Sequence, residues 1–145
     1  MEQRLSIVTL GVHDIERSAA FYRALGWRRV EGPGDVVAFD LIGMTLGLYP
    51  LDRLAEVMGV WPEALGSGAM TLAHNVRERD EVNPLIARFK LAGGKILKPA
   101  QEAAWGGYHG YASDPDGHVW EIAWNPLAPL GRDGAFRWKG HGGDG

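Results

Sequence analysis

The predicted order of secondary structure occurs twice along the chain, and this repetition constrains the fold more than any other feature. A strand, a helix and three further strands come first, and the same order returns after residue 68. Val12 corresponds to Val76 and Gly26 to Gly93, at offsets of 64 and 67 residues. Self-similarity of this kind indicates a repeated structural unit. The sequence therefore predicts an α+β fold of two β-α-β-β-β repeats, with eight strands in two four-stranded halves.

The first repeat begins with an apolar strand and a capped helix. Residues 5–12 are predicted to form the strand, and Asp14 is a residue type that caps helix N-termini. Apolar residues follow helical spacing from Ile15 to Leu25, and Gly26 is suited to end that helix. Three more strands are expected, at 27–30, 36–42 and 45–49, with a turn at 32–35 between the first two.

The second repeat shows the same pattern. Val82, Leu85, Ile86 and Phe89 have the i, i+3, i+4, i+7 spacing of one buried helix face, which predicts a helix over 82–92. Strands are expected at 69–76, 95–97, 108–113 and 118–124. We therefore predict one domain over 1–145: repeat 1 at about 4–50, a connecting helix within 51–66, repeat 2 at about 68–126 and a tail at 127–145.

Composition excludes several classes of function. The net charge is −3 with no block of like charge, so neither nucleic acid nor a membrane surface is an expected partner. The chain has no cysteine, which excludes disulfides, thiolate metal sites and cysteine nucleophiles. No apolar run approaches the length of a membrane span, and the N-terminus does not have the pattern of a signal peptide. A cytoplasmic location is expected.

Two segments have a sequence that resembles a known superfamily. They are LGVHDIERSAAFYRALGW at 10–27 and DPDGHVWEIAWNP at 114–126. Together with the duplication, they resemble the vicinal oxygen chelate superfamily, which includes glyoxalase I, extradiol dioxygenases, and fosfomycin- and bleomycin-resistance proteins. The resemblance covers about 4–126. It implies a cupped, eight-stranded mixed sheet with helices on its convex face, and a homodimer as the usual assembly.

The resemblance also implies where a metal would bind. In the metal-dependent members, the first and the last strand of each repeat supply one ligand each. The matching positions here are Ile7, Gly47, Ala69 and Glu121. Only Glu121 can coordinate an ion, so no cofactor is expected, although a divalent metal stays possible. The bleomycin-resistance branch, by resemblance, binds its ligand without metal.

Strand parity predicts which side chains share a face with Glu121. If the four-residue turn 114–117 pairs Ser113 with His118, Glu121 lies on the face of Tyr108, and His109 lies on the face of Trp120. A one-residue bulge would instead bring His109 to Glu121 as a substitute metal ligand. On the other strands, one face is predicted to be small or weakly polar and the opposite face bulky and apolar. The small face comprises Ile7, Thr9, Gly11, Thr45, Gly47, Tyr49, Ala69, Thr71 and Ala73.

Three classes of function fit these observations. The first is a metal-independent protein that binds a small planar or aromatic molecule in the cup; the second is a lyase or dioxygenase-type enzyme of the glyoxalase family, with Glu121 as base or part of a rearranged metal site. The third is an interaction module whose cup is filled by its own side chains. Glu121 could equally be a structural, hydrogen-bonded remnant. The proposed ligand contacts are Thr9, Tyr49, Trp61, Thr71, Trp105 and Tyr108, with Glu121 as the catalytic candidate.

Overall fold

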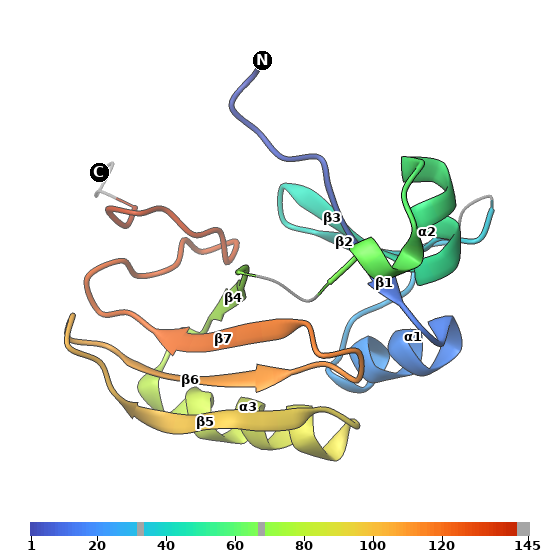
Figure 1. Cartoon of the computed structure of the whole chain (residues 1–145). Coiled ribbons are helices and arrows are strands. Elements are labelled where there is room, and N and C mark those ends of the chain that lie inside the picture. The colour runs from blue at the N-terminus through green and yellow to red at the C-terminus, as the bar shows by residue number, and fades with distance from the viewer. Residues whose placement is uncertain (32–33, 67–68, 142–145) are drawn as a thin grey trace. The chain divides into compact units, whose positions relative to one another are not determined.

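The computed structural model describes residues 1–31, 34–66 and 69–141 as two compact units, Met1–Ala69 and Met70–Gly145 (Figure 1). The predicted turn at 32–35, the predicted boundary at 68 and the end of the tail lie partly outside the described residues. Each unit has a helix against an open mixed sheet, so the predicted α+β class is confirmed. None of the helices in the described part of the chain has the length and apolar character needed to cross a bilayer.

The first unit is a three-stranded sheet with its main helix on one face. Strand order is β1-β3-β2, where β1 runs parallel to β3 and β2 runs antiparallel to it. Tyr22 packs against Phe39 with ring centroids 5.9 Å apart, and both are buried. The elements are β1 (Ile7–Val12), α1 (Ile15–Ala24), β2 (Val37–Leu41), β3 (Met44–Pro50), α2 (Leu51–Met58) and the 3-10 turn η1 (Pro62–Ala64).

The second unit is a four-stranded sheet whose helix α3 covers one face (Figure 1). Strand order is β4-β7-β6-β5, with β4 parallel to β7 and the other pairs antiparallel. Phe89 of the helix meets Trp120 of the sheet at 6.2 Å between ring centroids, and Ile122 is fully buried. The elements are β4 (Leu72–Asn75), η2 (Arg79–Glu81), α3 (Val82–Leu91), β5 (Lys95–Glu102), β6 (Tyr108–Ser113) and β7 (Val119–Trp124).

The helices begin and end near the predicted residues. Asp14 accepts a hydrogen bond from the Arg17 amide at 3.0 Å, which satisfies a backbone donor at the start of α1. The connecting segment contains a helix, α2, as predicted. Helical spacing of apolar residues was therefore the signal common to the three helices, and the side-chain cap was an additional signal at α1.

The expected count of eight strands is not met in the described residues, which contain seven. The segment predicted as a strand at 27–30 forms only an isolated bridge between Val30 and Ala38. Trp27 instead stacks on Tyr22 of α1, with ring centroids 5.5 Å apart and an interplanar angle of 14°. The side chain is thus tied to the helix, and the backbone joins the sheet only at its last residue.

The β6–β7 hairpin has a different register from the predicted one. Ser113 pairs with Val119, not with His118. The Gly117 amide donates to the Asp114 carbonyl oxygen at 3.1 Å, and Gly117 has a φ of 89°. A type I turn followed by a left-handed glycine adds one residue to the loop and shifts the second strand by one position. The prediction that paired Ser113 with His118 is therefore wrong.

The first sheet has the predicted faces. Thr9 pairs with Gly47 and Ile7 with Thr45, so these four residues lie on one face. On the other face Leu10, Leu46 and Leu48 are buried. The two faces follow from the two-residue period of a strand, although Gly47 is itself buried on the first face.

Candidate functional site

A polar cluster lies on the face of the second sheet opposite α3. Tyr111 of β6 is directly across from Glu121 of β7, and His109 is across from Ala123. Since paired residues share a face, all four side chains project from the same side, here called the Glu121 face. Trp120 packs against α3, so the alternate residue Glu121 points away from that helix.

The cluster is held by two hydrogen bonds to one oxygen. Glu121 Oε2 lies 2.7 Å from His109 Nδ1 and accepts a hydrogen bond from the Tyr111 hydroxyl at 3.0 Å. The side chains of His109 and Glu121 are 14% and 23% exposed, so both groups are partly desolvated but reachable from solvent. Charge-assisted hydrogen bonds in such surroundings are stronger than neutral ones.

Tyr111 is kept protonated by its surroundings. Burial, then the hydrogen bond to Glu121 and the carboxylate's negative charge, raise the pKa of the Tyr111 hydroxyl above its ordinary value. A tyrosine in this state donates its hydrogen to Glu121 throughout the neutral range. Sequence reasoning missed Tyr111, because the predicted register placed it on the opposite face.

Trp105 adds an aromatic wall to the cluster. It lies in the loop between β5 and β6, and its ring meets the His109 ring edge-on, with centroids 5.5 Å apart and an interplanar angle of 81°. His109 also makes an edge-on contact with Tyr111, at 5.5 Å and 62°. Trp105 is 41% exposed. The site therefore combines hydrogen-bonding groups with an exposed aromatic surface.

Tyr108 does not belong to this site. It pairs with Trp124, and its hydroxyl accepts a hydrogen bond from Asn83 Nδ2 of α3 at 3.0 Å. The guanidinium of Arg79 lies 3.9 Å from the centroid of its ring. The prediction that Tyr108 shares the face of Glu121 is wrong, for the same one-residue shift in the hairpin.

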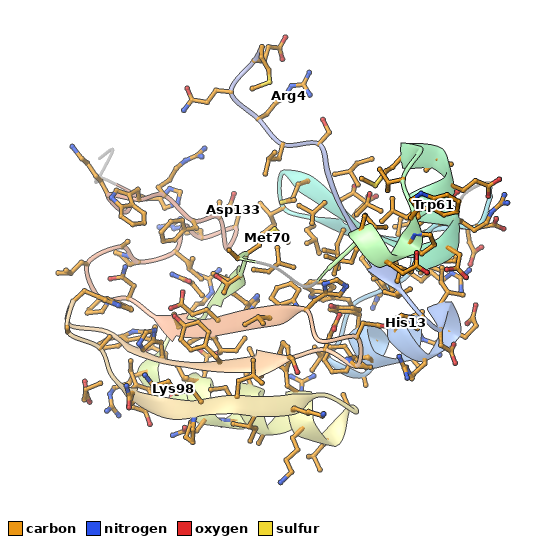
Figure 2. The ribbon with its side chains drawn as sticks, viewed as in Figure 1. Arg4, His13, Trp61, Met70, Lys98 and Asp133 are labelled. Carbon is orange, nitrogen blue, oxygen red and sulfur yellow. The ribbon has the colours of Figure 1, made fainter. Side chains whose placement is uncertain are left out.

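The remaining predicted contacts are distributed over both units. Thr71 precedes β4 in the second unit and is exposed, whereas Thr9, Tyr49 and Trp61 belong to the first. Trp61 follows α2, is 81% exposed and is labelled in Figure 2. Of the residues predicted from sequence, the structure thus brings together Trp105, His109 and Glu121.

The four positions that the resemblance assigns to metal ligands do not form a donor set. At Gly47 an added Cβ would lie 3.7 Å from Ile7 Cγ2, so these two positions adjoin and neither can coordinate an ion. In the described part of the chain, no three His, Cys, Asp or Glu side chains are grouped so as to hold a metal. The residues present do not fit a divalent ion in the manner of the metal-dependent relatives.

The pairing also corrects one of those positions. Ala73 pairs with Glu121 as Thr9 pairs with Gly47. Ile7 is two residues before Thr9, so its equivalent in the second unit is Thr71, two residues before Ala73. Ala69, the position that the resemblance assigns, lies two residues further from β4 than Thr71.

Comparisons with known proteins agree with this architecture. The model of the glyoxalase/bleomycin resistance protein/dioxygenase superfamily matches residues 4–122. This chain belongs to that superfamily. Among solved structures, it is similar to a glyoxalase-related enzyme from Fulvimarina pelagi, with 41% sequence identity and a TM-score of 0.87. That alignment covers 94% of this chain and 99% of the other.

More distant members of the superfamily share the fold alone. A glyoxalase/bleomycin resistance protein/dioxygenase family enzyme from Burkholderia phytofirmans PsJN is 23% identical, with a TM-score of 0.76 and coverage of 83% of this chain and 98% of the other. A lactoylglutathione lyase from Agrobacterium tumefaciens is 22% identical, with a TM-score of 0.66 and coverage of 88% and 97%. The comparison with curated proteins gives no match.

Proposed function

We propose that this member of the superfamily binds a small planar or aromatic molecule on the Glu121 face, and that it needs no metal ion to do so. The observation that carries the proposal is the hydrogen-bonded cluster of Glu121, His109 and Tyr111 beside the exposed ring of Trp105. Ligand sites commonly combine apolar walls with a few convergent polar groups. Trp105 supplies an aromatic surface for stacking, and the cluster supplies directional hydrogen bonds.

Metal independence is supported by the chemistry of the side chains. Ile7, Gly47 and Thr71 occupy positions where the metal-dependent relatives have ligands, and a threonine hydroxyl is a weak ligand at best. Glu121 alone would hold a divalent ion weakly, and its Oε2 already takes part in two hydrogen bonds. Affinity must then come from stacking and hydrogen bonding.

A thermal-shift screen tests the proposal. Phenols and aromatic carboxylic acids are the first probes, because both combine a planar ring with one acidic group. Binding at a hundredfold excess over Kd adds about 2.7 kcal/mol to the free energy of unfolding. For a chain of this size, that raises Tm by roughly 5–10 °C.

Two tryptophan variants separate the site from the rest of the surface. Trp105→Ala removes the proposed stacking surface and should weaken binding, whereas Trp138→Ala is the matched control. Trp138 is also a tryptophan of the second unit, lies in the tail and is 86% exposed. Equal loss in both variants, or no ligand in the whole panel, would contradict the proposal.

Thr71, Thr9, Tyr49 and Trp61 remain proposed ligand contacts. Calorimetry of single alanine variants of these four residues, with a ligand found in the screen, would show which of them contact the ligand. A variant of a contact residue should bind more weakly than wild type. If only Thr71→Ala reduced the heat of ligand binding, the ligand contacts would belong to the second unit alone.

An enzyme of the lyase or dioxygenase type is the second candidate. It is favoured by one observation: His109 and Glu121, both residue types that bind divalent metals, meet at 2.7 Å on one face. Elemental analysis of the purified protein separates the two candidates. About one tightly held ion per chain would favour the enzyme, and a metal-free protein that still binds its ligand would favour the binding role.

A further inference from the structure

One ring nitrogen of His109 is held by Glu121, at 2.7 Å between Nδ1 and Oε2, and the other has no hydrogen-bond partner in the described part of the chain. We infer that His109 Nε2 is the proton acceptor of this site, that Glu121 positions it, and that the ligand bears a weakly acidic O–H group, as a phenol does. The inference rests on the proposed binding function and names its ligand class. In place of the metal of its relatives, the site would then have a carboxylate–imidazole pair.

The hydrogen bonds determine which ring nitrogen holds the hydrogen. An ionised carboxylate can only accept, so with Glu121 ionised the hydrogen in the 2.7 Å contact belongs to His109 Nδ1. Tyr111 donates to the same oxygen. In a neutral imidazole with a hydrogen on Nδ1, the other nitrogen has a free lone pair. Nε2 is thereby fixed as an acceptor.

The accepting nitrogen has no hydrogen-bond partner within the described part of the chain, residues 1–31, 34–66 and 69–141. Over the same residues, every fully buried side-chain nitrogen or oxygen of a residue that is not exposed has a partner. Because His109 is such a residue, its unpartnered Nε2 must have accessible surface. The proposal assigns this nitrogen to the ligand hydroxyl because it is unpartnered and not fully enclosed.

The proton transfer is balanced within the site. The O–H bond of the phenol breaks, its hydrogen forms a bond to His109 Nε2, and the electron pair stays on the phenolate oxygen. The imidazolium that forms lies against the carboxylate of Glu121, whose negative charge stabilises it. Trp105, edge-on to the same imidazole, is placed to contact the phenol ring.

Nitrogen NMR of the protein without any ligand tests the first half of this inference. When the spectrum shows a neutral His109 ring, we expect a protonated Nδ1 and an unprotonated Nε2. Glu121→Ala should convert the ring to the Nε2–H form, which free histidine prefers. A wild-type His109 in the Nε2–H form would overturn the inference and leave the binding function untouched.

The second half is tested with 4-nitrophenol, whose phenolate absorbs visibly and whose phenol does not. Wild-type protein should increase the phenolate fraction at a pH where the free probe is partly protonated. His109→Asn keeps an N–H for Glu121 but has no counterpart of Nε2, and should weaken phenolate binding about tenfold. His74→Asn is the control, because His74 pairs with Ile122 on the α3 face of the same sheet.

The outcomes separate the two proposals. A bound probe that stays a phenol, or equal effects of His109→Asn and His74→Asn, would overturn the role of His109. Absence of any 4-nitrophenol binding would overturn the ligand class named here. The proposed function itself fails only if the wider panel of aromatic probes gives no binding.

Discussion

Replacing Gly117 by alanine tests the turn that sets the register of the β6–β7 hairpin. Gly117 has a φ of 89°, and an L-residue in the left-handed region costs about 1–2 kcal/mol. An added Cβ would meet nothing within 4 Å, so packing neither adds to that cost nor reduces it. Alanine also restricts the unfolded chain, and this raises the free energy of unfolding by about 0.4–1 kcal/mol. The expected net loss in the free energy of unfolding is about 1 kcal/mol.

Thermal unfolding followed by circular dichroism measures this loss, which corresponds to a fall in Tm of about 3 °C. Gly66→Ala is the matched control, because its Cβ would also meet nothing within 4 Å and its φ is outside the left-handed region. That variant should be about 0.4–1 kcal/mol more stable than wild type, because alanine restricts the unfolded chain and meets no strain at this position. If the free energy of unfolding of Gly117→Ala were no lower than that of Gly66→Ala, the description of a bulged turn would be refuted. The pairing of Tyr111 with Glu121, which depends on that turn, would be refuted with it.

Four other predictions follow from packing, capping, titration and assembly. Asp14→Ala should lower the free energy of unfolding in urea by about 1 kcal/mol, since the α1 cap is lost; an unchanged urea midpoint would contradict the cap. Trp120→Ala should cost about 3–5 kcal/mol, because this side chain is 5% exposed under α3, and a loss below about 1 kcal/mol would refute that packing. In an ultraviolet pH titration, one tyrosine should ionise above the usual range, and Tyr111→Phe should remove that late step; a late step that persists in the variant belongs to another residue. Light scattering should give about twice 15.8 kDa for a homodimer, whereas a mass near 15.8 kDa at micromolar concentration would refute the dimer.

The helices could be predicted from sequence because their signals are local. Asp14 caps the first helix within one turn, and Val82, Ile86 and Phe89 mark the buried face of α3 without reference to the sheet. The apolar face shared by Leu10, Leu46 and Leu48 could also be predicted, since a two-residue period needs no knowledge of the neighbouring strand.

The site could not be predicted in the same way, because it depends on one backbone dihedral angle. The sequence from Asp114 to Gly117 is compatible with a two-residue hairpin loop and with a bulged loop. The two loops differ by one residue in which position of β7 pairs with each residue of β6. That single position moves His109 and Tyr111 to the face of Glu121 and moves Tyr108 away from it. A glycine at the last position of a type I turn is the signal that could have favoured the bulge.

Binding by protein stripped of metal tests the central claim most directly. The measurement is calorimetry of a ligand from the screen, before and after treatment with a chelator, with elemental analysis confirming the loss of divalent ions. We predict the same Kd in both samples, and a large loss of affinity on Glu121→Gln or His109→Asn. Binding that disappears with the chelator and returns on adding back a divalent ion would contradict a site built from hydrogen bonds and stacking alone.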